Sequence, residues 1–140
     1  MKRMCLAIAI AAGLLPTAAC TGGRSVFAYS AETGGNVKRG KDLIVHYDCG
    51  SCHSIPGIRE ARGLVGPPLI LMGRRTYIAG EVPNTPDNLV KWLMDPKSIE
   101  SGTAMPKLGL SEDQARDISA YLYTLQSRSW NKGVWNGGGQ

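Results

Sequence analysis

Aromatic residues are scarce in this sequence, which has one Phe, three Trp and five Tyr among 140 residues. The length predicts a single domain. Without its targeting and linker segments, the chain leaves about 95 residues to fold, and so short a domain buries only about two-thirds of the surface of its unfolded chain. We therefore expect a large apolar bound group to complete the interior.

The sequence also lacks a basic stripe, an alternating strand pattern and an internal repeat. The formal net charge is +5, and removal of Lys2 and Arg3 with the N-terminal segment leaves 14 basic against 11 acidic residues, a net charge of +3. So modest a charge excludes nucleic acid as a partner. No strand signal competes with the helical segments of the chain.

The N-terminus has the pattern of an export signal. Lys2 and Arg3 precede the uncharged apolar run Met4–Leu15, which ends at Pro16. This run is too short to cross a bilayer but suits the hydrophobic region of a signal peptide. We therefore predict a signal peptide at residues 1–19 and a periplasmic protein. The alternative is an N-terminal hydrophobic helix that belongs to the fold.

Cys20 is the odd cysteine of the exported chain, because Cys5 is lost with the signal peptide. It follows small residues and an apolar run, a setting that resembles the cleavage box of bacterial lipoproteins, although Thr17 stands where an aliphatic residue is usual. We predict that Cys20 is lipidated and anchors the protein to a membrane; cleavage by ordinary signal peptidase is the alternative. Residues 20–35, rich in Gly, Ser, Thr and Ala, are predicted to be a linker.

Three segments have the periodicity of amphipathic helices. The first runs from about residue 37 to residue 49. Thr85 and Pro86 begin the second as N-cap and first helical residue, and Ser111 begins the third, where Gln114 completes a capping box. The predicted buried faces comprise Val37, Gly40, Ile44 and Tyr47 in the first helix, Leu89, Trp92 and Leu93 in the second, and Ala115, Ile118, Leu122 and Leu125 in the third.

The remaining segments are a long connection and a tail. The connection between the first two helices is rich in Gly and Pro, and it is too long to stay unstructured in a compact domain without something to wrap around. Residues 127–140 have no periodicity and are predicted to be a flexible tail. The alternative for this tail, which contains two Trp, is an interface element.

A C-x-x-C-H motif occupies residues 49–53. In an exported protein it predicts covalent attachment of one c-type haem. The spacing suits this chemistry, because the thiols of Cys49 and Cys52 add to two vinyl groups at one porphyrin edge and His53 then reaches the iron. The alternatives are a thioredoxin-like redox pair, which needs a strand-to-helix context, and a zinc site, which needs more ligands than the only other histidine, His46, supplies.

The second axial position of such an iron is filled by histidine, methionine or water. We predict Met105, because it lies on a loop between the second and third helices and precedes Pro106, which keeps its backbone extended. Met72 follows an apolar run and is expected in the core. Met94 lies within the second helix, and His46 is expected to face solvent.

From about Val37 to Leu125 the chain resembles the class I cytochrome c family. The matching residues are the C-x-x-C-H motif, Gly66-Pro67-Pro68-Leu69, residues 84–89 with Trp92 and Pro96, Met105-Pro106, and Tyr121-Leu122. The middle section is especially similar to the cytochrome c domains fused to subunit II of some haem-copper oxidases. The chain lacks the copper domain and the two transmembrane helices of that subunit.

The resemblance implies an all-α, class I cytochrome c fold over residues 36–126, in which the N- and C-terminal helices cross and a third helix and loops wrap around one covalently bound haem. It implies that the Pro67 carbonyl accepts a hydrogen bond from the second ring nitrogen of His53, and that Gly40 and Tyr121 meet where the helices cross. It also suggests that Arg75, Tyr77 and Trp92 contact the haem propionates. The alternative is that Arg75 is solvated and that Tyr77 and Trp92 are ordinary core aromatics.

A haem iron with His and Met ligands is six-coordinate and leaves no position for a substrate, so we expect an electron carrier and not an enzyme. Its expected partners are a redox donor and acceptor of a respiratory chain, such as a haem-copper oxidase or a quinol–cytochrome c oxidoreductase. Two alternatives stay open. One is a haem enzyme or gas-binding protein with an open sixth iron position, and the other is a dedicated electron-transfer subunit of an oxidase or dehydrogenase complex.

Overall fold

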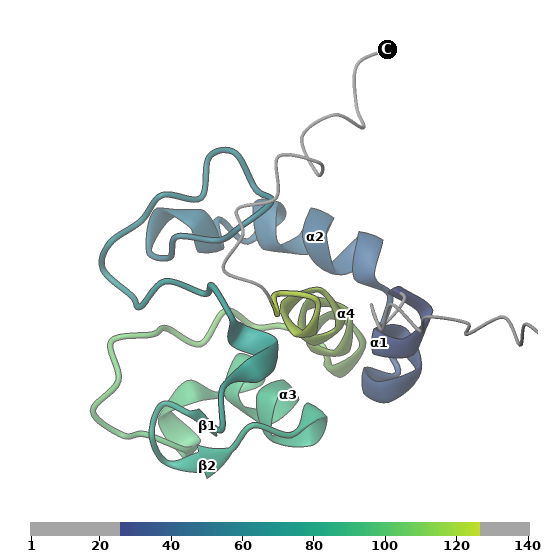
Figure 1. The fold of residues 1–140 in the computed structure, drawn as a ribbon. Coiled ribbons are helices and arrows are strands. Elements are labelled where there is room, and N and C mark those ends of the chain that lie inside the picture. Colours follow the sequence, from purple (N-terminus) through teal and green to yellow (C-terminus); the bar gives the residue numbers. More distant parts are fainter. Residues whose placement is uncertain (1–25, 127–140) are drawn as a thin grey trace, which may run out of the picture.

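The computed structural model describes residues 26–126, whose arrangement is shown in Figure 1. The predicted signal peptide, Cys20 and the C-terminal tail lie outside this range. The described residues form four α-helices, three 3₁₀ turns and one small hairpin. These are α1 (Val26–Thr33), α2 (Val37–His46), η1 (Cys49–Ser51), η2 (Met72–Arg74), β1 (Tyr77–Ile78), β2 (Val82–Pro83), α3 (Pro86–Met94), η3 (Pro96–Ser98) and α4 (Glu112–Tyr123).

Local contacts determine where α2 begins and ends. Asn36 caps its first turn, where the side-chain oxygen accepts a hydrogen bond from the Arg39 amide at 2.9 Å. The helix ends at His46, short of the predicted end near residue 49, because Asp48 lies in the left-handed region with φ 51°. The chain then enters the 3₁₀ turn that starts at Cys49.

The starts of α3 and α4 are as predicted from the sequence. The Thr85 side chain accepts a hydrogen bond from the backbone amide of Asn88, the third residue of α3, at 3.3 Å, and Pro86 takes the first helical position. Ser111 and Gln114 form a reciprocal capping box: the Gln114 amide donates to the Ser111 hydroxyl at 3.3 Å, and the Ser111 amide donates to the Gln114 side chain at 3.0 Å. The sequence therefore locates both helix starts correctly.

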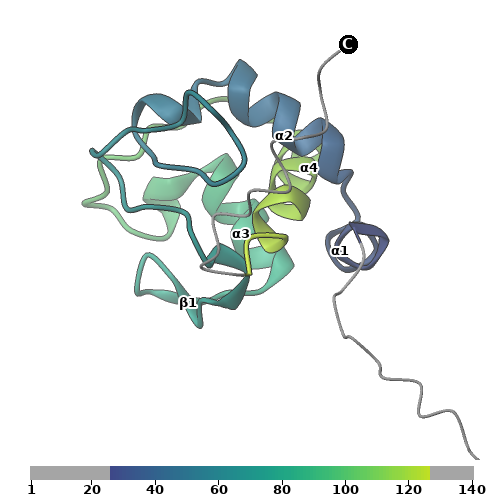
Figure 2. The same cartoon turned by 45° about the horizontal axis from the view of Figure 1, so that its top comes forward.

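Residues 26–33 form α1, whereas the sequence predicts a linker over residues 20–35. The helix packs against α4, as Figure 2 shows. At its end Thr33 is buried, and the Thr33 carbonyl accepts a hydrogen bond from the Arg116 guanidinium of α4 at 3.2 Å. A helix of eight residues is marginal by itself in water, so its contacts with α4 account for its stability.

The sequence predicts an all-α fold, but β1 and β2 form a small hairpin. The fold is therefore mostly helical and not strictly all-α. Its strands are antiparallel, with Tyr77 opposite Pro83 and Ile78 opposite Val82. Two residues in each strand are too few to show the alternation that reveals a strand in a sequence. The pairing therefore becomes apparent only in the tertiary structure.

The most extensive contacts between helices are those of α2 with α4, which cross near Gly40 (Figures 1 and 2). A Cβ atom at Gly40 would overlap the Asp117 carbonyl and touch the Ile118 amide. Glycine therefore permits the close helix approach that the sequence predicts. The α4 atoms nearest to Gly40 belong to Asp117 and Ile118, one turn before the Tyr121 that the resemblance implies.

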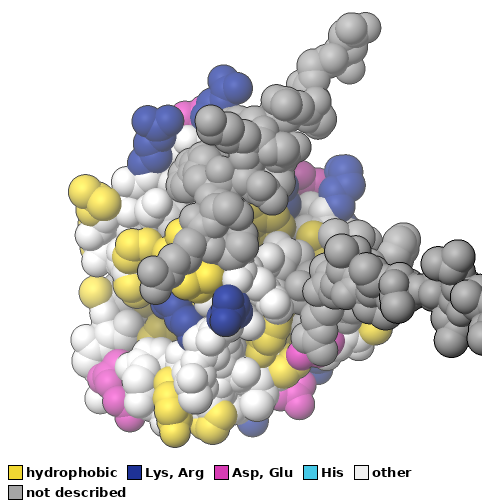
Figure 3. All heavy atoms as spheres, viewed as in Figure 1, with side chains coloured by type: hydrophobic (Ala, Val, Ile, Leu, Met, Phe, Trp, Pro, Cys, Tyr) yellow, Lys and Arg dark blue, Asp and Glu magenta, His cyan; other side chains and the backbone are white. Residues whose placement is uncertain are grey.

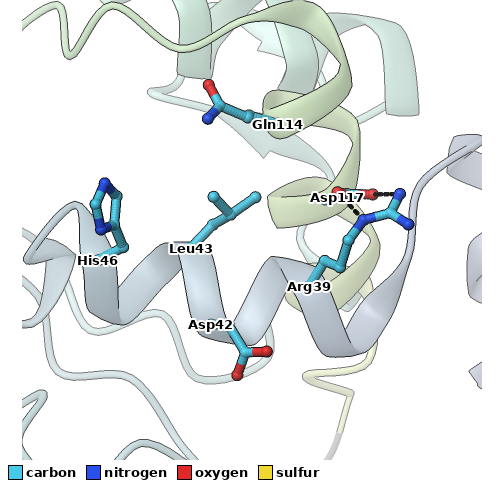
Figure 4. Close-up of a pocket in the computed structure, with 6 residues that line it drawn as sticks. All are labelled: Arg39, Asp42, Leu43, His46, Gln114 and Asp117. Carbon is cyan, nitrogen blue, oxygen red and sulfur yellow. Dashed lines mark hydrogen bonds and ion pairs between the residues drawn. The ribbon is translucent and has the colours of Figure 1, made fainter.

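Asp117 connects the start of α2 to α4, as Figure 4 shows for its contact with Arg39. The Asp117 side chain is only 6% exposed, and its carboxylate accepts hydrogen bonds from the Arg39 guanidinium at 2.7 and 3.0 Å and from the Asn36 amide at 2.6 Å. Because both oxygens have donors, the buried charge is paired and hydrogen-bonded, as burial requires. A groove runs here between the two helices, lined by Arg39, Asp42, Leu43, His46, Gln114 and Asp117.

The hydrophobic core lies where α2, α3 and α4 meet the loops. Ile44, Leu89, Leu93 and Ile118 are buried there, on the helix faces that the sequence predicts. Ile55, from the loop after α2, is completely buried beside them. Within residues 26–126, none of the helices has the length and apolar character needed to span a bilayer.

Gly40→Ala is expected to lower the free energy of unfolding by about 1–3 kcal/mol or more, the usual cost of forcing extra volume into a packed interface. Because the Cβ atom would overlap backbone atoms of α4, the cost is expected at the upper end of this range, above the gain of about 1 kcal/mol that alanine brings over glycine inside a helix. Denaturant unfolding of the purified protein measures the change. The control is Gly102→Ala, because a Cβ atom there meets only the Glu100 carboxylate. Equal unfolding midpoints for the two variants would contradict the close crossing.

Candidate functional site

The C-x-x-C-H motif follows α2 directly and includes the turn η1. The Cys52 and His53 amides both donate to the Cys49 carbonyl, at 3.3 and 3.0 Å, so the chain turns tightly between the two thiols and the imidazole. Both thiols are partly buried and neither is in a disulfide. Burial raises the pKa of the Cys49 thiol, which is the opposite of the lowered pKa that a thioredoxin-like nucleophile needs.

The imidazole of His53 is held in one orientation by a backbone carbonyl. The Nδ1 atom lies 2.8 Å from the Pro67 carbonyl oxygen, which is the contact that the resemblance implies. Because a carbonyl only accepts hydrogen bonds, Nδ1 carries the proton and the lone pair of Nε2 is left for a metal. Gly66 permits this contact, since a Cβ atom there would overlap the imidazole ring. Histidine ligands of metal sites are commonly oriented in this way.

Residues 62–69, termed the strap, run beside the motif and carry this carbonyl. The Gly63 amide donates to the Gly50 carbonyl at 2.9 Å, and the Gly66 amide donates to the Cys52 carbonyl at 2.8 Å. These two bonds attach the strap to the motif at two points, three residues apart. The carbonyl that orients the imidazole is thus positioned by backbone contacts.

Tyrosine hydroxyls of α4 hold the loops on either side of the strap. The Tyr121 hydroxyl donates to the Pro56 carbonyl at 2.7 Å. The Tyr123 hydroxyl donates to the Asn84 carbonyl at 3.1 Å. Burial is the main cause that raises the pKa of each tyrosine to about 12. Both side chains therefore stay protonated, and able to donate, throughout the neutral pH range.

Asn84 is a positioning residue that the sequence does not reveal. Its side-chain amide donates to the Met72 carbonyl at 2.9 Å and to the Arg75 carbonyl at 3.0 Å, and its own carbonyl accepts from Tyr123. It thereby connects the turn η2 to the C-terminal helix. In the sequence Asn84 is only the residue before a helix cap, and no local pattern signals contacts with carbonyls 9 and 12 positions away.

The structure separates the three candidate methionines by environment. Met105 is half-buried on the loop before α4, where its side chain packs against the core and its amide donates to the Thr103 hydroxyl at 3.2 Å. Met72 is 6% exposed and belongs to the core, as expected. Met94 is the last residue of α3 and also packs against the core. Of these three methionines, Met105 is the one that lies on a loop.

The three candidates for propionate contacts differ in their surroundings. Arg75 is half-buried, and its guanidinium donates to the Pro68 carbonyl of the strap and, at 3.5 Å, to the Ile70 carbonyl. Trp92 packs against the core from α3. Tyr77 is 55% exposed in β1. Arg75 therefore supports the strap, a role that the sequence does not predict.

The other histidine lies apart from these residues. His46 is exposed on α2, as expected, and its ring meets the edge of Tyr47 with centroids 5.0 Å apart. It lines the groove of Figure 4, which includes none of the predicted haem-site residues. Among residues 26–126, no cluster of three His, Cys, Asp or Glu side chains is arranged to hold a metal ion. The described residues thus offer nothing that fits a zinc site.

The residues present fit a covalently attached haem. Two partly buried thiols without a disulfide stand next to a histidine whose Nε2 is left for iron, and a half-buried methionine lies on a separate loop. In Figure 3, hydrophobic side chains also gather on the face between the loop after α2 and the hairpin. Fold and site together define the class, a haem-binding electron-transfer domain.

A family profile described as cytochrome c matches residues 37–126. The match covers more than half of the chain, and the chain belongs to the cytochrome c family. The family assignment agrees with the helical fold and with the position of the C-x-x-C-H motif near the start of the matched segment.

Among curated proteins, cytochrome c oxidase subunit 2 of Alkalihalophilus pseudofirmus is 33% identical over 89 residues, and that of Bacillus subtilis is 36% identical over 98 residues. The alignments cover 63% and 66% of this chain. They cover only 25% and 27% of the relatives, so the chain spans about a quarter of the length of the proteins that it matches. The resemblance to the subunit II cytochrome c domain is thereby confirmed.

We expect the free energy of unfolding to fall as the pH rises from 10 to about 12. Tyr121 and Tyr123 have a pKa of about 12 in the folded protein, against 10 for an unperturbed tyrosine. The folded state holds these protons more tightly, so the stabilisation is complete below pH 10 and is lost as the pH rises through the folded pKa.

Tyr121→Phe should reduce the fall in the free energy of unfolding between pH 10 and about 12, and addition of Tyr123→Phe should reduce it further. At pH 7, Tyr121→Phe is also expected to cost about 1 kcal/mol, because the Pro56 carbonyl loses its donor. Denaturant unfolding at several pH values, with all variants in the same redox state, measures both effects. A double variant as pH-sensitive as the wild type would contradict the assignment to these tyrosines.

Proposed function

We propose that this chain is an exported electron carrier with one haem, attached through Cys49 and Cys52 and bound at the iron by His53. The observation that carries the proposal is the 2.8 Å hydrogen bond between His53 Nδ1 and the Pro67 carbonyl, which leaves Nε2 for the iron. When bound, the haem supplies an iron that takes up and releases one electron. The residues of the chain hold this group, orient its ligand and keep water away.

Met105 is the second axial ligand in this proposal. It lies on a loop, it is half-buried, and it packs against the same core as Cys49 and Trp92. Its amide is held by the Thr103 hydroxyl, which restrains the loop beside the side chain. A methionine ligand raises the reduction potential and fills the sixth position of the iron. The site then has no place for a substrate, which favours electron transfer over bond chemistry.

The acidic groups of the haem would meet Arg75, Tyr77 and Trp92. Arg75 already donates to the Pro68 and Ile70 carbonyls through one nitrogen, and its other nitrogens keep donors for an anion. Arg75 would thus connect the strap to a propionate. Trp92 and Tyr77 would add neutral donors from α3 and β1.

The partners in this proposal are a quinol–cytochrome c oxidoreductase as electron donor and a haem-copper oxidase as acceptor. The relatives that match the chain are oxidase subunits, which supports the oxidase context. The same relationship favours one alternative, a dedicated electron-transfer subunit held in an oxidase complex. An electron carrier of this kind would act in the periplasm.

A lipid on Cys20 would hold the domain close to a membrane. Six residue steps separate Cys20 from the start of α1 at Val26, and a chain of that length spans at most about 20 Å. This distance is much shorter than the distance that a linker over all of residues 20–35 could span. The domain would therefore meet membrane-bound partners from a confined position.

Met105→Ala should abolish the weak near-infrared charge-transfer band between sulfur and ferric iron. We also expect a lower reduction potential, within the range of roughly 0.8 V that axial ligands control, and new binding of cyanide or carbon monoxide. Near-infrared spectra and redox titrations measure these changes, with Met94→Leu as the control that keeps the band. A band that persists without Met105 would assign the ligand to another methionine. Absence of the band from the intact protein, with ready binding of added ligands, would favour the open-site alternative.

The mature N-terminus is expected to be Cys20 carrying lipid with more than one acyl chain, because a single chain gives only weak and reversible anchoring. Mass spectrometry of the N-terminal peptide of the native protein measures the modification. Cys20→Ser should release the protein from membranes into the soluble fraction, while its visible spectrum stays the same. An unmodified N-terminus in the native protein would show that Cys20 is not an anchor.

A further inference from the structure

An ion pair crosses the loop that carries Met105. Residues 99–111, termed the Met105 loop, connect the turn η3 to α4, and in Figure 1 they extend to the left before they return to α4. The Lys107 ammonium lies 2.8 Å from a carboxylate oxygen of Asp95, and the two residues are 12 positions apart. Met105 lies between them in the sequence. The ion pair therefore closes the chain into a ring that includes the predicted iron ligand.

The two halves of the Met105 loop are held by different contacts. Up to Met105, hydrogen bonds within the loop restrain the backbone, such as the one from the Met105 amide to the Thr103 hydroxyl at 3.2 Å. Beyond Met105, residues 106–110 make a single hydrogen bond to the part of the chain that the structure describes, and it is the contact from Lys107 to Asp95. This ion pair is therefore the polar contact that restrains the second half of the loop.

Asp95 lies on a backbone that other contacts already hold. Its amide donates to the Lys91 carbonyl of α3 at 2.9 Å, and its carbonyl accepts a hydrogen bond from the Ser98 hydroxyl at 2.6 Å. Pro96, the next residue, is fully buried. The hydrogen bond from Lys107 is the main cause that lowers the pKa of the Asp95 carboxyl. An exposed ion pair has to order two side chains, and here most of that ordering falls on Lys107.

Lys107 is close enough to Met105 for the ion pair to act on it. Pro106, the residue between them, has a fixed φ, and Leu108 on the other side of Lys107 packs against the core, as Met105 does. We propose that Asp95 and Lys107 position Met105, because their ion pair holds the second half of the loop at the end of α3 and slows release of the methionine sulfur from the iron. In this release the sulfur keeps its lone pair and no electron is transferred. The inference rests on the proposed haem with Met105 as its ligand.

Imidazole binding to the oxidised, haem-loaded, full-length protein tests this role, because an added ligand enters the sixth position of the iron only after the sulfur leaves. At saturating neutral imidazole, the rate measured by stopped-flow absorbance is the rate of sulfur release. Lys107→Gln and Asp95→Asn should each raise this limiting rate about two- to fivefold, which is the scale of an exposed ion pair. The double variant should be no faster than the faster single variant. Lys107→Arg keeps the charge and should restore a rate close to that of the wild type.

The matched control is Lys38→Gln, which removes another exposed ion pair, the one from Lys38 to Asp42 at 3.1 Å on α2. This variant should keep the wild-type limiting rate. Added salt should raise the rate of the wild type toward that of Lys107→Gln, because it screens the ion pair, and it should leave the rate of Lys107→Gln unchanged. The near-infrared band between sulfur and ferric iron should stay present in every variant, since Met105 is still the ligand.

A limiting rate in Lys107→Gln equal to that of the wild type would overturn the proposal. Equal acceleration by Lys38→Gln would also overturn it, because the effect would then be a general loss of stability. Additive acceleration in the double variant would show that Asp95 and Lys107 act separately, with the same consequence. Each of these results leaves the near-infrared band in place and so does not affect the proposed haem site. A wild-type protein without the band would instead contradict ligation by Met105, and this inference with it.

Discussion

The close crossing of α2 and α4 at Gly40 is the constraint on which the rest of the structure depends. Contact between the Gly40 backbone and the Asp117 carbonyl sets the separation of the two helices, and the paired Asp117 carboxylate fixes their relative position at one end. α2 leads directly into the C-x-x-C-H motif, and α4 carries the Tyr121 hydroxyl that holds the loop after this motif. A larger separation of α2 and α4 would move the C-x-x-C-H motif away from the helix whose Tyr121 holds the following loop.

Orientation of the histidine is a second consequence of tight packing. The 2.8 Å contact from His53 to the Pro67 carbonyl exists because the strap lies against the motif, and glycine at position 66 leaves room for the ring. A hydrogen bond of this kind contributes only about 1 kcal/mol to stability. Its importance for function is that it selects one tautomer and one ring orientation, which a metal ligand needs. The contact therefore matters more for the proposed haem than for the fold.

The two sides of the strap lie in opposite environments. On its inner side, Gly66 and the Pro67 carbonyl contact the His53 ring. On its outer side, Leu64 and Val65 are almost fully exposed.

Local chemistry made several features predictable from the sequence alone, namely the capping box at Ser111, the helix start at Thr85 and the C-x-x-C-H motif that begins at Cys49, because neighbouring residues produce each of them. The resemblance added the Pro67 contact. The sequence did not predict α1, the hairpin or the part of Asn84, since a short helix, two-residue strands and a single amide are stable only through contacts with distant segments. The sequence by itself determined which groups are available to bind a haem. Only the tertiary structure decided how they face one another and which side chains reach solvent, because burial and close approach depend on residues far apart in the chain.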